Sequence, residues 1–201
     1  MQFPEFVEFF KSSNNEKDET QEVSRQIDID KTPEETIEYL ITDIKKQLAD
    51  ELLERIMGNT FQKFENLVAE LILKMGYGSS KQDILQKAGK SGDEGIDGVI
   101  KEDVLGLDKI YIQAKKWQGN IGRPEIQKFA GALQMQNARK GIFITTSSFT
   151  KEAEECVSRF NSNIVLIDGE KLTELMIKYN LGVSVKQTYE VKKIDEDFFI
   201  D

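Results

Sequence analysis

The chain has 201 residues, with 36 acidic and 27 basic side chains and a formal charge of −9. It contains no histidine and one cysteine, Cys156, which excludes Ser-His-Asp and Cys-His catalysis, an internal disulfide and a zinc site made of several cysteines. No apolar run approaches the roughly 20 residues that span a bilayer, and the N-terminus lacks a secretory signal. We therefore expect a cytoplasmic protein without a membrane partner, whose acid–base chemistry uses carboxylates, lysine, tyrosine or metal-bound water.

The charge is unevenly distributed along the chain. Residues 1–60 hold 15 acidic and 7 basic side chains, a net of −8, whereas residues 81–151 hold 12 basic and 8 acidic side chains, a net of +4. A basic stretch favours contact with phosphate groups, although charged surfaces are often only solvated. Its members near the candidate site described below are Lys87, Lys90, Lys115, Lys116, Arg123, Lys128, Arg139 and Lys140.

In chain order, a linker and a long helix are predicted first. Residues 11–31 are polar and mixed in charge, which is typical of a linker. The run Thr32-Pro33-Glu34-Glu35 supplies an N-cap threonine, a proline at N1 and a glutamate at N3, and so predicts a helix start. The apolar residues that follow form one stripe, which we expect to pack on the next domain or, alternatively, to form a dimer seam. They are Ile37, Leu40, Ile41, Ile44, Leu48, Leu52 and Ile56.

The remaining chain alternates helices and strands. A helix is predicted over 60–75, with Glu65 near its start, where this residue either faces a functional site or is solvated. The order of the elements predicts an α/β fold with a mixed central sheet flanked by helices. After that helix we expect strands at 95–100 and 109–115, a helix at 124–136, a strand at 141–147, a helix at 150–161, a strand at 163–168, a helix at 169–179 and an edge strand within 182–193.

Two of these strands carry the polar residues that indicate a function. Gln113 and Lys115 lie in one strand and point the same way because side chains alternate, and Asp97 can converge on them if the two strands pair as a hairpin. A carboxylate and an amide oxygen can bind a divalent cation, and an ammonium group can reach a water on it. The three residues therefore predict metal-dependent hydrolysis of phosphodiesters.

From about Phe64 to Phe198 the chain resembles the catalytic domain of Mrr-type restriction endonucleases, the modification-dependent (type IV) enzymes of the PD-(D/E)xK nuclease superfamily. Together the matching stretches are far more specific than the three polar residues alone. They are Phe64-Glu65, Met75-Gly76-Tyr77-Gly78, Ser91-Gly92-Asp93-Glu94-Gly95-Ile96-Asp97-Gly98, Gln113-Ala114-Lys115, Ile144-Thr145-Thr146-Ser147-Ser148-Phe149-Thr150 and Leu166-Ile167-Asp168-Gly169.

The resemblance implies a restriction-endonuclease-like αβββαβ core, preceded by a linker helix. It implies an enzyme of host defence that cuts double-stranded, modified (methylated) DNA with Mg²⁺, or with Mn²⁺ in its place. In this reading Asp97, Gln113 and Glu65 hold the metal and Lys115 is the catalytic lysine. Because duplex scission needs two cuts, we expect a homodimer or a higher homo-oligomer. The basic residues that we expect to contact DNA are Lys90, Lys116, Arg123 and Lys128.

Two departures from the family pattern leave alternatives open. The wider superfamily has Glu or Asp where this chain has Gln113, although Mrr-like members commonly carry glutamine, and a neutral ligand should hold the cation more weakly. We expect residues 1–57 to be a remnant of an N-terminal DNA-binding region plus the linker helix, and residues 58–201 to be the catalytic domain. The alternatives are a truncated, non-cleaving regulatory or DNA-binding fragment and a structure-specific (junction) nuclease.

Overall fold

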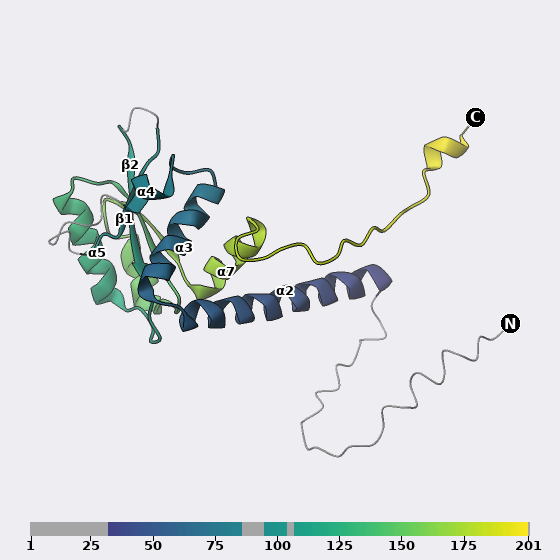
Figure 1. The fold of residues 1–201 in the computed structure, drawn as a ribbon, viewed down its shortest axis with the longest axis horizontal. Helices are drawn as coiled ribbons and strands as arrows, with labels where there is room; N and C mark the ends of the chain where they lie inside the picture. Colours follow the sequence, from purple (N-terminus) through teal and green to yellow (C-terminus); the bar gives the residue numbers. More distant parts are fainter. Residues whose placement is uncertain (1–31, 86–94, 104–106, 201) are drawn as a thin grey trace, which may run out of the picture. The chain divides into compact units, whose positions relative to one another are not determined.

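The computed structural model describes residues 32–85, 95–103 and 107–200. The chain divides into two units, Met1–Leu40 and Ile41–Asp201, and every strand found in the described residues lies in the second unit. The domain boundary expected near residue 57 coincides with the end of the first described helix and stays a prediction. The elements (Figure 1) are α2 Pro33–Gly58, α3 Phe61–Lys74, α4 Lys81–Leu85, β1 Gly98–Lys101, β2 Lys109–Lys115, α5 Arg123–Met135, β3 Lys140–Thr145, α6 Lys151–Val157, β4 Asn163–Ile167, α7 Gly169–Lys178 and the 3₁₀ helix η1 Glu196–Phe199.

The four strands form one mixed sheet in the order β1-β2-β3-β4. β1 and β2 pair antiparallel with Gly98 opposite Ile112, as the predicted hairpin requires. β3 runs parallel to β2 with Thr145 opposite Lys115, and β4 runs parallel to β3. Two strands lie between α4 and α5 among the described residues, where the resemblance implies three consecutive strands, and residues 86–94 lie outside the described ranges.

Two apolar cores lie on opposite faces of this sheet. Strand residues Ile110, Ile112 and Ala114 pack with α3, α7 and the end of α2. The other face is covered by α5 and α6, whose Phe129 packs edge-to-face on Phe143 of β3. Alternation along β2 therefore sends even-numbered side chains toward α3 and odd-numbered side chains toward α5. Figure 1 shows α3 and α5 on either side of the strands.

Gly141 of β3 fixes how closely α5 approaches the sheet. A Cβ atom at this position would lie 2.7 Å from Leu133 Cδ1 and 2.9 Å from Phe129 Cε1. Both of these α5 side chains are fully buried, so they could move aside only by displacing their neighbours. The missing side chain at Gly141 lets α5 lie directly on β3, which sets the position of every residue on that helix.

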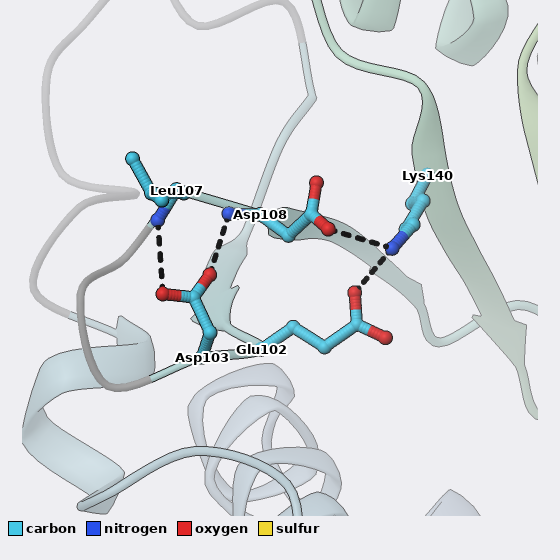
Figure 2. A network of polar contacts seen from close by, with 5 residues as sticks. All are labelled: Glu102, Asp103, Leu107, Asp108 and Lys140. Carbon is cyan, nitrogen blue, oxygen red and sulfur yellow. Dashed lines mark hydrogen bonds and ion pairs between the residues drawn. The ribbon is translucent and has the colours of Figure 1, made fainter.

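The end of the hairpin away from Asp97 is tied by a polar network (Figure 2). The Asp103 carboxylate accepts hydrogen bonds from the backbone N–H groups of Leu107, at 3.2 Å, and Asp108, at 2.7 Å. Lys140, at the start of β3, forms ion pairs with Glu102 and Asp108. Grouping Lys140 with the basic residues near the candidate site was wrong, because it lies at the opposite end of β3 from Thr145, the partner of Lys115.

Two further expectations about elements meet different outcomes. The α2 stripe buries only Leu52 and Ile56 fully, and Ile44 is 63% exposed, so only the end of this helix packs as predicted. The expected strand within 182–193 was wrong, since residues 183–195 form no strand and Val185 and Tyr189 are exposed. Within the described ranges, no helix is both long enough and apolar enough to cross a membrane.

Candidate active site

Asp97 lies just before β1 and is held against the backbone of β2. Its N–H donates to the carbonyl of Ile112 at 2.8 Å, which continues the antiparallel pairing. Its carboxylate Oδ2 accepts a hydrogen bond from the backbone N–H of Ala114 in β2 at 2.7 Å. The carboxylate therefore lies beside the peptide that joins Gln113 and Ala114. The structure brings Asp97 and this segment together, as the hairpin predicted.

Glu65 of α3 and Asp97 line the same small cavity, of about 10 Å³, which is close to the room that one water needs. Most of the other lining residues are apolar, among them Val68, Ile112 and Ala114. Burial raises the pKa of the Asp97 carboxyl to about 6, an effect that the Ala114 hydrogen bond opposes and the Glu65 carboxylate reinforces. Burial also raises the pKa of Glu65. Two carboxylates in such a place are electrostatically suited to a shared cation.

Gln113 contributes a buried polar oxygen. The residue is 8% exposed, and its Oε1 has no hydrogen-bond partner among the residues that the structure describes. A Cβ at Gly95, which has φ +96°, would lie 2.8 Å from Gln113 Nε2, so glycine is required for this close approach. A buried acceptor without a donor costs free energy, and a bound cation would remove that cost.

These oxygen donors fit a hard divalent cation. Carboxylate and amide oxygens are the ligands that Mg²⁺, Mn²⁺ and Ca²⁺ prefer. No group of three or more His, Cys, Asp or Glu side chains suited to a metal occurs among the described residues. A cation at Asp97 would therefore need the Glu65 carboxylate or the Gln113 oxygen as a further ligand, and only Glu65 lines the same cavity as Asp97.

Lys115 points toward α5, on the side of β2 opposite the cavity that Glu65 lines. Its Nζ forms an ion pair with the Glu125 carboxylate in the first turn of α5. The same Nζ lies 4.8 Å from the centre of the Trp117 ring. The four predicted residues are thus divided by the strand: Asp97 and Glu65 share the cavity, and Gln113 and Lys115 follow the other face. Their roles stay predictions.

Glu125 was missed by the sequence analysis. Its nearest sequence signal is an acidic residue directly after Arg123-Pro124, which indicates only a favourable helix start. Nothing local connects it to Lys115, ten positions earlier in the chain. The ion pair results from the approach of α5 to β3 that Gly141 allows.

The Thr145-Thr146-Ser147 run fixes the chain beyond Lys115. The Thr145 hydroxyl donates to the carbonyl of Lys115 at 2.9 Å. The Thr146 hydroxyl accepts from the N–H of Trp117 and donates to its carbonyl, both at 2.9 Å. The Ser147 hydroxyl donates to the carbonyl of Gly119. Three hydroxyls therefore bond to the backbone at the end of β2 and in the loop that follows, and they hold the lysine and this loop in place.

The expected DNA-contacting residues lie in two places. Lys116, in the loop after β2, donates to the carbonyl of Asn59 between α2 and α3. Arg123 and Lys128 are exposed on α5, the helix that carries Glu125. Lys90 lies outside the described residues. The three described residues are therefore all on elements that flank Lys115.

Comparison with known proteins identifies the family. A model of the restriction endonuclease family, for the Mrr catalytic domain, matches residues 56–176, more than half of the chain. The type IV methyl-directed restriction enzyme EcoKMrr of Escherichia coli (strain K12) is 43% identical over 168 residues. That alignment covers 84% of this chain and 54% of the relative, so the chain spans about half the length of the curated relative.

A solved structure agrees with these matches. The DNA modification-dependent restriction endonuclease AspBHI superposes with a TM-score of 0.51 at 18% identity, over 69% of this chain and 36% of that one. At this level of identity the likeness shows the fold, and it confirms the restriction-endonuclease-like α/β fold expected from the sequence. The matched region contains Glu65, Asp97, Gln113 and Lys115. The chain belongs to the restriction endonuclease family, as a member with an Mrr-type catalytic domain.

Proposed function

We propose that this chain is the catalytic part of a divalent-metal-dependent endonuclease that hydrolyses phosphodiester bonds of duplex DNA in host defence. The observations that carry the proposal are the Asp97 carboxylate, which accepts from the backbone N–H of Ala114, and the buried Gln113 oxygen, which has no hydrogen-bond partner among the described residues. An unpaired buried acceptor and a nearby strand's carboxylate with a raised pKa are both poorly explained by stability alone. A cation site explains both.

The residues divide the chemical work. Asp97, Gln113 and Glu65 would hold Mg²⁺, or Mn²⁺ in its place, and the bound ion would polarise a phosphate oxygen and acidify its own water. Attack by the water oxygen forms a new P–O bond as the bond to the leaving sugar oxygen breaks; the attacking water loses a proton to solvent, and the leaving oxygen takes one from solvent. Lys115 orients the attacking water and offsets the negative charge that develops on the phosphoryl oxygens. Glu125 holds the lysine ammonium in position on the α5 side.

The first test is nicking of a supercoiled plasmid with Mg²⁺. We expect wild-type protein to cut and Asp97→Ala and Lys115→Ala to lose at least 100-fold in rate, the order of magnitude of one preorganised electrostatic group. Lys171→Ala is the matched control, because Lys171 also pairs with a glutamate, Glu174 at 2.9 Å, but lies on α7. Equal cutting by all four proteins would refute the assignment.

Calorimetry separates this proposal from a non-cleaving fragment. A functional site should bind Mg²⁺ or Mn²⁺ with a measurable heat, and Asp97→Ala should remove that heat. Binding by wild type without any cleavage would favour a regulatory or DNA-binding role. No binding by wild type would contradict the cation site itself.

We propose that the substrate is modified DNA, because the curated relative is named a methyl-directed restriction enzyme. Parallel cleavage of unmethylated plasmid, methylated plasmid and a four-way junction tests this choice. Preference for the methylated plasmid supports it, and preference for the junction would favour a structure-specific nuclease.

We also propose that two copies act together, since a double-strand break requires two cuts. Sedimentation of the protein with and without duplex DNA tests this. A protein that stays monomeric on DNA and leaves only nicked circles would contradict it.

A further inference from the structure

The loop after β2 presents a large aromatic side chain beside Lys115. Trp117 is 51% exposed, and its ring centre lies 4.8 Å from Lys115 Nζ. Single exposed apolar residues are ordinary on protein surfaces. This one differs because it stands next to the proposed catalytic ammonium and has a defined orientation.

The exposure of the indole is not the result of a loose loop. Both backbone polar groups of Trp117 are bonded to one hydroxyl, that of Thr146, which is buried at the end of β3. The next turn lies against the edge of the indole, since a Cβ at Gly119 would lie 3.4 Å from Trp117 Nε1. The sheet therefore holds the backbone of Trp117 in place, while about half of its side chain stays exposed.

The neighbours of the ring have the chemistry of a nucleotide contact. An open cavity of about 480 Å³ is lined by Met57, Lys116, Trp117, Gln118 and Gly119. Its size falls within the range of sites that hold small organic groups. It offers an aromatic face for a base or sugar, an amide that can both donate and accept, and an ammonium for phosphate, the three kinds of contact that proteins use on nucleic acids.

We propose that Trp117 packs against a nucleotide that flanks the scissile phosphate and so sets the position of the strand over Lys115. This inference rests on the proposed nuclease function. Each DNA strand rises about 3.4 Å per nucleotide. A ring 4.8 Å from the ammonium that serves the scissile phosphate lies within about two nucleotides of it. Stacking is tolerant of sequence, so Trp117 positions the strand without selecting a base.

Fluorescence provides a direct test, because Trp117 is the sole tryptophan of the chain. The full chain is titrated with a short duplex in EDTA and again with Ca²⁺, while anisotropy of a labelled duplex measures binding independently. We expect the tryptophan emission to change in step with the anisotropy. A duplex that binds without altering the emission overturns the inference and leaves the nuclease proposal intact.

Variants measure the strength of the contact. Trp117→Ala should weaken duplex binding by roughly 5- to 100-fold, the range of one base–aromatic stack, and Trp117→Phe should restore most of the affinity. Tyr77→Ala is the control, as an aromatic residue of similar exposure, 42%, outside this loop. If Trp117→Ala lowered turnover but left duplex affinity unchanged, the indole would act by positioning Lys115 and not by contacting DNA. This result would overturn the inference. No duplex binding and no cleavage by wild type would refute the underlying function as well.

Discussion

Asp97 is a charged group in a place that disfavours its charge. Its pKa is raised to about 6 from the ordinary 3.8, chiefly by burial. In the unfolded chain the pKa of Asp97 is near 3.8, so between pH 3.8 and pH 6 folding favours the protonated carboxyl. The stability that this preference provides is present below pH 3.8 and is lost as pH rises through 6. At neutral pH the metal-free protein therefore carries a cost at its proposed catalytic residue.

Asp97→Asn should remove that cost. The amide keeps the size of the side chain and an oxygen that can accept from Ala114 N–H, but it has no charge. In EDTA we expect the variant to gain free energy of unfolding relative to wild type. This gain should be larger at pH 8 than at pH 5 by roughly 1.5 kcal/mol. Urea unfolding at the two pH values measures this difference. A difference between variant and wild type that does not change with pH would contradict the burial argument.

Glu125 should matter for turnover more than for stability. Its ion pair with Lys115 is partly exposed, and such pairs contribute at most about 1 kcal/mol to stability. Glu125→Gln leaves the lysine without its carboxylate partner, so we expect kcat to fall about tenfold with little change in KM. Steady-state cleavage rates measure this effect, and Glu125→Asp should restore part of the rate.

Glu174→Gln is the matched control for this substitution, because it removes the partner of Lys171 on α7. It should leave both kcat and KM near wild type. If Glu125→Gln lowered the melting temperature enough to explain the lower cleavage rate, Glu125 would have only a structural role.

At the scale of elements, the seating of α5 on β3 determines where Glu125 lies. Gly141→Ala would place a methyl group 2.7 Å from Leu133 Cδ1, among fully buried side chains. Overpacking of this kind costs about 1 to 3 kcal/mol. We expect a loss of that size in chemical unfolding, together with slower cleavage because α5 must move.

Gly131→Ala on α5 itself supplies the contrast. A Cβ at Gly131 meets no atom of the described residues within 4 Å, and alanine is the better helix former by about 1 kcal/mol. This variant should be as stable as wild type or more so. Equal destabilisation by both substitutions would show that packing at Gly141 does not limit the approach of the helix.

Elements that depend on local pattern were predicted closely. The strand at 109–115 has the predicted bounds, and the helix predicted over 60–75 runs from Phe61 to Lys74 with Thr60 as its N-cap. The strand expected within 182–193 failed because the sequence of a segment can suit a strand without showing that a sheet edge will receive it. Local pattern carries no information about the partner.

For the candidate site too, the sequence predicted contacts between neighbouring strands but not contacts that depend on tertiary packing. The Asp97 hairpin follows from neighbouring strands, so its contact with the 113–115 segment was accessible from the sequence. The Lys115–Glu125 pair and the bonds from Thr146 to Trp117, 29 residues apart, depend on how α5 and β3 pack. Alternation did place Gln113 and Lys115 on one face, but it gave no reason to place Glu65 across the strand from them.

At the scale of the whole molecule, a net charge of −9 opposes contact with DNA. Binding therefore depends on where the basic groups lie. Arg123 and Lys128 are exposed on α5, near Lys115, whereas Lys140 is neutralised by Glu102 and Asp108 at the far end of the hairpin. Position, not total charge, should set the salt dependence of binding.

This argument predicts how duplex affinity changes with salt. The logarithm of the binding constant falls with the logarithm of salt concentration by about 0.9 for each phosphate that the protein neutralises. Arg123→Ala and Lys128→Ala should each reduce the slope by about that amount, and the double variant by about twice as much. Anisotropy titrations of a labelled duplex between 50 and 200 mM salt measure the slopes. Lys140→Ala should leave the slope unchanged, and an equal reduction in this variant would mean that the basic residues act through total charge alone.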